Sequence, residues 1–300
     1  DVQDVGSRYY TYAATLCMAL DICAAAGVGV VVLDRPNPLG GEVVEGGRVG
    51  AAYRSFVGWL DRRQRHGLTV AEIALLHVKE SGLRVALEVV TCTGWRVGDY
   101  LDEQSTADLP AVWTPPSPNM PTVQTAVLYP GLCLLEATTL SEGRGTTRPF
   151  EVVGAPGLDA RAFADNIERA SDGELRTRPL LFEPTFQKHA GRVCAGVVLE
   201  VADRRKLRAV RAGVAIIAAA RATMGEAFGW RAEAYEFVTD RPAFDLLMGG
   251  SAARQALESG AGVDAACADF AAAADLLRVR TEGLLRYPRQ SGIFAAKGRP

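Results

Sequence analysis

The sequence predicts an α/β protein, in which a domain with a mostly parallel sheet precedes a smaller α+β domain. Strand and helix patterns alternate through the first half of the chain, which favours a parallel sheet with helical connections. The continuous apolar run at residues 28–33 is typical of a strand buried on both faces of such a sheet. After Leu158 helical patterns dominate, so we place a boundary near residue 157, between domains at 1–157 and 158–300.

The first elements have clear start and stop signals. Residues 9–26 have one apolar helical face, and Gly27 is a suitable helix end. A strand at 28–33 then ends at Asp34. The pair Thr69 and Glu72 has the spacing of a capping box, which predicts a helix running to about Ser81. Residues 83–90 form the next predicted strand.

The later elements are less regular in pattern. Residues 122–129 predict a short helix stopped by Pro130 and Gly131, and 132–138 predict another strand. The remaining expected elements are a strand at 194–202 and helices at 159–170, 206–224, 251–259 and 263–287.

In open parallel sheets, ligands bind beyond the carboxyl ends of the strands. This rule gathers Asp4, Asp34, the loop at Trp95 and Arg96, and Glu136 at one edge of the predicted sheet. Residues 3–8 also supply Gln3 and Arg8 at a strand-to-helix switch. Spacing alone therefore predicts a polar crevice at this edge.

Composition argues against several classes of function. A net charge of −2 and a pI near 6.0 give no electrostatic footprint for nucleic acid or an anionic membrane. There is no uninterrupted apolar run of about 20 residues, so no membrane span is expected. The six cysteines form no CxxC pair and the three histidines are scattered, which makes a structural zinc site improbable. Residues 46–50 do not have the spacing of a dinucleotide-binding loop.

The window from Pro115 to Pro156 concentrates restricted backbone and reactive side chains. Prolines fix φ and glycines open other conformations, so this window can hold polar groups rigidly. Its polar members are Asn119, Tyr129, Glu136, Glu142, Arg144 and Arg148. The alternative interpretation is a long surface loop with solvated charges.

Besides the N-terminal residues Gln3, Asp4 and Arg8, three clusters carry candidate chemistry. Directly after the first strand, Asp34 could orient a hydroxyl or act as a base, Arg35 could bind an anion and Asn37 could bond an amide; the alternative is an Asx turn. His66 could form a polar corner before the capped helix, or be a structural residue.

The third cluster is acidic. Glu136 and Glu142 could divide acid and base roles if their surroundings separate their pKa values, with Arg144 keeping one carboxylate ionised. The alternative is an internal ion pair that holds the loop.

Long motifs also resemble a known family. They include DVQDVGSRYYTY, VVVLDRPNPLGG, SFVGW, RHGLTVAEIA, PPSPNMPT, AVLYPGLCLLEATTLSEGRGTTRPFEVVGAP, FEPTFQKHAG and YEF. Together they resemble the NamZ family of exo-β-N-acetylmuramidases across nearly the whole chain. The resemblance implies a Rossmann-like catalytic domain followed by a smaller C-terminal domain, with no metal or nucleotide cofactor. It implies removal of N-acetylmuramic acid from the non-reducing ends of peptidoglycan fragments, which are MurNAc-GlcNAc saccharides.

The resemblance also implies a set of cleft residues. They are Asp34, Arg35, Asn37, His66, Asn119, Tyr129, Glu136, Glu142 and Arg144. The lactyl carboxylate needs a cation, for which Arg35, Arg144 and Arg148 are candidates. Glycoside hydrolysis normally uses two carboxyl groups, and we expect Glu142 or Glu136 to supply one, with Asp34 a further candidate.

Family members carry an upstream segment with a Pro-Glu-His-Gly motif whose glutamate is a catalytic candidate, and we expect such a segment to precede Asp1. A non-catalytic protein that binds muropeptides or sugars in the same cleft is the alternative. The substrate favours a secreted or periplasmic site, although cytoplasmic recycling is an alternative.

Overall fold

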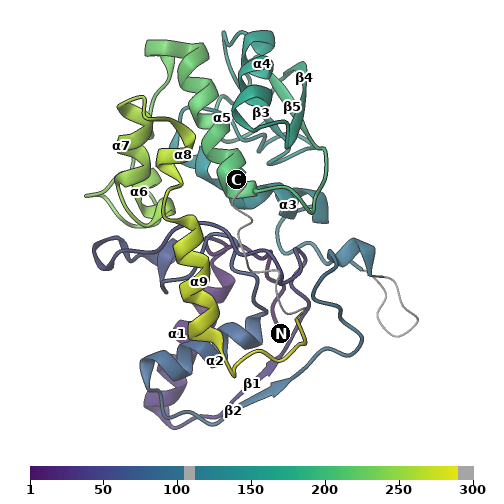
Figure 1. Ribbon diagram of the computed structural model, residues 1–300, viewed down its shortest axis with the longest axis vertical. Helices are drawn as coiled ribbons and strands as arrows, with labels where there is room; N and C mark the ends of the chain where they lie inside the picture. The colour runs from purple at the N-terminus through teal and green to yellow at the C-terminus, as the bar shows by residue number, and fades with distance from the viewer. Residues whose placement is uncertain (105–111, 290–300) are drawn as a thin grey trace. The chain divides into compact units, whose positions relative to one another are not determined.

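A computed structural model describes residues 1–104 and 112–289, which divide into two compact units (Figure 1). The first unit comprises Asp1–Pro118 and Asp269–Pro300, and the second comprises Asn119–Ala268. The fold is α/β, as predicted. Parallel strands occur in the first unit and antiparallel strands in the second.

The first unit is built on two parallel strands, β1 (Val30–Leu33) and β2 (Leu87–Val90), paired in the register Val30 to Leu87. Helices α1 (Tyr12–Ala26) and α2 (Val70–Ser81) cover one face of this pair, and Leu20, Val32 and Val70 share that core. Three 3₁₀ turns, η1 (Ala51–Tyr53), η2 (Phe56–Gly58) and η3 (Leu101–Glu103), and helix α9 (Phe270–Thr281) complete the unit.

Burial of β1 differs from the prediction. Val32 is buried, but Val31 and Leu33 are 55% and 47% exposed. Because α1 and α2 contribute to the same hydrophobic cluster, alternate side chains of β1 point to a face that the described residues leave open. The strand is therefore buried on one face, whereas its continuous apolar pattern predicted burial on both faces.

The second unit combines a three-stranded antiparallel sheet with helices. The strands β3 (Val152–Ala155), β4 (Leu175–Phe182) and β5 (Cys194–Val201) have the order β3-β5-β4. Helices α4 (Ala160–Ala170) and α5 (Ala209–Met224) pack on each other (Figure 1). The other elements are α3 (Val123–Leu132), η4 (Cys133–Ala137), η5 (Gly225–Ala227), α6 (Ala243–Met248), α7 (Ala252–Glu258) and α8 (Gly262–Ala266).

The strand predicted at 132–138 is wrong. Helix α3 continues through Pro130 and Gly131 to Leu132, and the chain then tightens into the 3₁₀ helix η4. Both segments are almost entirely buried, and a short apolar run does not distinguish a buried helix from a buried strand. Glu136 therefore lies on a 3₁₀ helix of the second unit, and the prediction that it joins Asp34 at one sheet edge is wrong.

The unit boundary also differs from the expected position near residue 157. Residue 157 lies between β3 and α4, inside the second unit. The reason is strand pairing, because β3 is hydrogen-bonded to β5 with Val152 opposite Val198. The chain on both sides of residue 157 thus belongs to one sheet and its covering helices.

None of the helices in the described part of the chain has the length and apolar character that crossing a membrane requires.

The close approach of α3 to α5 at Gly131 predicts a stability effect. A Cβ atom added at Gly131 would lie 1.9 Å from the carbonyl oxygen of Ala209 at the start of α5. Because backbone cannot yield as a side chain can, Gly131→Ala should lower the free energy of unfolding by at least about 2 kcal/mol. Urea unfolding measures this. Gly250→Ala, where an added Cβ meets no atom within 4 Å, is the matched control and should stay within about 0.5 kcal/mol of the parent. Equal effects of the two substitutions would contradict the close helix packing.

Candidate functional site

The acidic cluster of the second unit is built by η4 and the turn that follows it. Glu136 lies on η4, and Glu142 and Arg144 lie on the turn leading to β3. Gly143, between them, has a φ of +80°, and an added Cβ would lie 2.8 Å from the carbonyl oxygens of Arg148 and Val152. Glycine is required here because the backbone is both left-handed and tightly packed.

Glu136 is buried and accepts hydrogen bonds on both carboxylate oxygens. Arg144 Nη2 donates to its Oε1, and the Tyr235 hydroxyl donates to its Oε2 at 2.9 Å. Burial raises the pKa of Glu136, and the charge of Glu142 raises it further; Arg144 and the Tyr235 hydroxyl oppose this rise. Burial, together with the Glu136 charge, also raises the pKa of Tyr235 well above its usual value, so this hydroxyl remains a donor.

Glu142 has a different cation. Lys188 Nζ donates to Glu142 Oε2 at 3.0 Å and to the carbonyl oxygens of Leu135 and Leu140 at 2.7 and 2.9 Å. Glu142 is only 3% exposed, and Arg144 Nε lies 3.8 Å from its other oxygen. Arg144 therefore forms ion pairs with both carboxylates, whereas Lys188 pairs with Glu142.

An aromatic and sulfur layer borders this cluster. Tyr129 and Phe150 meet edge to face at 4.9 Å, and the Arg144 guanidinium lies over the Phe150 ring at 5.2 Å. The Cys133 thiol donates to the Tyr129 hydroxyl at 3.4 Å. Burial raises the pKa of both Tyr129 and Cys133 well above their usual values, so both are neutral at physiological pH.

Two other predicted residues of this unit have different surroundings. Arg148 forms a two-nitrogen pair with Glu151 Oε2 at 3.1 and 3.2 Å, and its side chain is 44% exposed. Asn119 is half-buried in the turn before α3.

In the first unit, Asp34 ends β1 and faces the start of α2. Its Oδ1 accepts from the backbone N–H groups of Arg35 and Ala71 at 3.0 Å, and its Oδ2 accepts from the Tyr287 hydroxyl at 2.6 Å. Burial raises the pKa of Asp34, and the hydrogen bond from Tyr287 is the largest effect opposing that rise. Asp34 is thus a carboxylate held at a helix N-terminus.

The remaining predicted residues of this unit have structural contacts. Asn37 Oδ1 accepts from the Leu39 N–H and Nδ2 donates to the Leu68 carbonyl, both at 2.9 Å, which is the Asx turn named above as the alternative. His66 is fully buried; its Nδ1 accepts from the Leu68 N–H at 3.1 Å, so the proton of the neutral ring lies on Nε2, 3.2 Å from an Asp4 oxygen. Arg35 pairs with Asp1.

The structure thus brings Glu136, Glu142, Arg144 and Tyr129 together in the second unit. In the first unit, Asn37 and His66 hold the same loop through Leu68. Sequence reasoning did not single out Lys188, Tyr235 or Tyr287. The motifs FEPTFQKHAG and YEF contained the first two, and the positive φ of Gln187 and His189 on either side of Lys188 marks an unusual turn.

Within residues 1–104 and 112–289, no three His, Cys, Asp or Glu side chains are grouped so that they could hold a metal ion.

Family comparisons match both parts of the chain. Residues 1–124 match the model for the N-terminal part of exo-β-N-acetylmuramidase NamZ, and residues 127–287 match the model for its C-terminal part. The chain belongs to the NamZ family. This confirms the resemblance found in the sequence motifs.

A curated NamZ relative and two solved structures support this membership. The peptidoglycan β-N-acetylmuramidase NamZ of Bacillus subtilis (strain 168) is 39% identical over 265 residues, which are 88% of this chain and 61% of the relative. The chain therefore spans about three fifths of the length of that relative. Two DUF1343 family proteins of Bacteroides fragilis NCTC 9343 are similar in structure. One has a TM-score of 0.85 at 26% identity, covering 96% of this chain and 74% of its own; the other has 0.76 at 28%, covering 97% and 75%.

Tyr235 provides a pH-dependent test of the NamZ-family cluster. Because the pKa of Glu136 is raised in the folded state, its contribution to stability is full below its unfolded pKa and is lost as pH rises through the folded pKa. Removing the Tyr235 hydroxyl raises that pKa further, so Tyr235→Phe should destabilise more at pH 8 than at pH 4. We expect a loss of about 1.5–3 kcal/mol where Glu136 is ionised.

Urea unfolding at both pH values measures this difference. Tyr12→Phe is the control, because the Tyr12 hydroxyl donates to a backbone carbonyl, that of Pro116, at 3.1 Å. A loss in Tyr235→Phe that is equal at both pH values, or larger at pH 4, would contradict the assigned role.

Proposed function

We propose that this chain takes part in glycoside hydrolysis that releases N-acetylmuramic acid from the non-reducing ends of peptidoglycan fragments. The observation that carries the proposal is a pair of buried carboxylates, Glu136 and Glu142. Arg144 lies beside both of them, and Lys188 bonds Glu142 alone. The family models and the curated relative are named for this activity, which supports the same substrate class, MurNAc-GlcNAc saccharides.

The surroundings of the two carboxylates suggest separate roles. The raised pKa of Glu136 suits a proton donor, because this group keeps its proton to a higher pH. When protonated, Glu136 can donate to the Tyr235 oxygen, since a phenol hydroxyl both donates and accepts. Lys188 supplies a counter-charge to Glu142, which suits a carboxylate that activates water or attacks the sugar.

The predicted substrate-binding side chains differ in the partners that they already bond in the structure. Arg144 bonds Glu136 and lies over Phe150, so we assign it to the carboxylates. Arg148 and Arg35 pair with Glu151 and Asp1, but their side chains are 44% and 35% exposed and can also reach the lactyl carboxylate. Asn37 uses both ends of its amide within the loop, and Asn119, half-buried in the turn before α3, is the other amide candidate for the N-acetyl group. Asp34, whose pKa is also raised by burial, is the third carboxyl candidate.

Substitution of the two glutamates tests the proposal. Glu136→Gln and Glu142→Gln keep the side-chain shape and remove the titratable group, so each should lower kcat at least about 100-fold. The measurement is release of N-acetylmuramic acid from a chromogenic muramic acid glycoside. Glu200→Gln, on β5 and with a largely exposed side chain, is the matched control and should retain activity.

Full activity in both variants would overturn the assignment. Binding of N-acetylmuramic acid that Glu142→Gln weakens, without any release by the unsubstituted chain, would instead assign the cluster to saccharide binding, the alternative function.

Arg148 tests how the acidic group of the substrate is recognised. Arg148→Gln should raise KM for a muramic acid glycoside by about tenfold, the value of one charge-assisted contact, and leave kcat nearly unchanged. The same variant should change KM little for an N-acetylglucosamine glycoside, which lacks the lactyl carboxylate. A fall in kcat with constant KM would show that Arg148 acts through the fold of the turn.

A further inference from the structure

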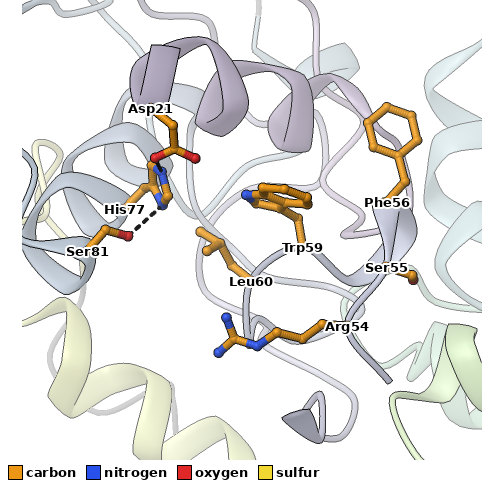
Figure 2. Close-up of a pocket in the computed structure, with 8 residues that line it drawn as sticks. All are labelled: Asp21, Arg54, Ser55, Phe56, Trp59, Leu60, His77 and Ser81. Atoms are coloured by element: carbon orange, nitrogen blue, oxygen red, sulfur yellow. Dashed lines mark hydrogen bonds and ion pairs between the residues drawn. The ribbon is translucent and has the colours of Figure 1, made fainter. Parts of the chain in front are cut away.

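A polar and aromatic pocket lies in the first unit, away from Asp34. Its volume is about 360 Å³, and it is lined by Asp21, Arg54, Ser55, Phe56, Trp59, Leu60, His77 and Ser81 (Figure 2). His77 and Ser81 come from the C-terminal half of α2, whereas Asp34 faces its first turn, so the two places lie at opposite ends of a helix about 18 Å long.

One side of the pocket is a chain of hydrogen-bonding groups. His77 Nε2 lies 2.7 Å from Asp21 Oδ1, and the Ser81 hydroxyl lies 3.3 Å from His77 Nδ1 (Figure 2). His77 is buried, while the side chain of Asp21 is 38% exposed and keeps acceptor capacity for a ligand. The group therefore presents an acceptor and a hydroxyl that can donate or accept.

This order of serine, histidine and aspartate does not make a good acyl-transfer site. Ser81 is the last residue of α2, where carbonyl groups rather than N–H groups are free. The negative end of the helix dipole would oppose an oxyanion at that position. Binding is therefore the better role for this group.

The other side of the pocket offers groups without partners. Within residues 1–104 and 112–289, neither the Arg54 guanidinium nor the Trp59 indole N–H has a hydrogen-bond or ion-pair partner, and the buried Ser55 hydroxyl has none either. The indole nitrogen of Trp59 faces the His77 side (Figure 2). The Arg54 guanidinium and the Trp59 indole N–H are therefore available to a ligand in this pocket.

We propose that this pocket binds an acidic saccharide, with the sugar ring against Trp59, hydroxyl groups on Asp21 and Ser81, and a carboxylate on Arg54. The face of a sugar ring is apolar and packs on an indole, while its rim both donates and accepts hydrogen bonds. A planar guanidinium suits a carboxylate. An aromatic acid would satisfy Trp59 and Arg54 but would leave the acceptor group around Asp21 unused.

The indole of Trp59 is a local probe for this site. In the full chain labelled with ¹⁵N-tryptophan, four tryptophans give indole signals, and that of Trp59 is the one lost in Trp59→Phe. Titration with N-acetylmuramic acid should shift this signal saturably, and N-acetylglucosamine should bind about tenfold more weakly because it lacks the carboxylate. The choice of N-acetylmuramic acid rests on the proposed function.

Arg54→Gln should reduce the affinity for N-acetylmuramic acid to that for N-acetylglucosamine, and leave the latter within about twofold. Arg96→Gln, an equal charge change at an exposed arginine of the same unit, should have no effect. Three results would overturn the site: a Trp59 signal that neither sugar moves, equal affinities for both sugars, or an unchanged titration in Arg54→Gln.

The two proposals fail separately. Glu142→Gln should leave the Trp59 titration intact while it removes hydrolysis. A chain that shows the titration and releases no sugar would contradict the proposed function and support this site.

Discussion

Two carboxylates buried together constrain the construction of the second unit. Burial of Glu136 and Glu142 without cations would be strongly unfavourable, because the free-energy cost of desolvating a charge exceeds the stabilisation that packing of the side chain provides. Arg144 and Lys188 must therefore reach the same place from separate segments. The turn that carries Arg144 is joined to the segment before Lys188, since Thr185 bonds the Gly145 carbonyl through both its backbone N–H and its hydroxyl at 2.9 Å. A Cβ at Gly145 would lie 2.5 Å from the Phe186 carbonyl, so glycine permits this junction.

The first unit uses the same principle to join distant parts of the chain. Glu72, in the first turn of α2, accepts from the backbone N–H of Arg286 at 3.0 Å and from Arg289 Nη2 at 2.6 Å. Arg280, on α9, bonds Asp61 and Glu80. Tyr287 then places its hydroxyl on Asp34. The candidate carboxylate at the end of β1 is thus positioned by residues more than 200 positions later in the chain, and a cut before α9 would remove its donor.

Local patterns predicted the local parts of this structure. The capping box of Thr69 and Glu72 forms as expected, with both reciprocal bonds present. Strand β5 and helices α1, α4 and α5 also follow their periodicity. Strand β4 was not anticipated because it is an edge strand containing Pro179 and alternating exposed arginines, a pattern that resembles a loop. The short buried run of η4 gave no periodicity that separates helix from strand.

The candidate site also has local parts, which the sequence predicted, and distant parts, which it did not. Glu136, Glu142 and Arg144 lie within nine residues, so one sequence window contained them. Lys188 and Tyr235 reach this cluster over separations of 46 and 99 residues, which no spacing rule connects. Their importance follows from charge balance. The nine residues from Glu136 to Arg144 hold two carboxylates, both buried, and only one arginine, so this segment is one cation short. Arg144 donates to Oε1 of Glu136, and Oε2 has to find its donor elsewhere in the chain. Such a deficit is a physical reason to look for a lysine and a hydroxyl elsewhere in the chain. It also means that removing any one partner leaves an uncompensated buried group, so substitutions in this network should be strongly non-additive.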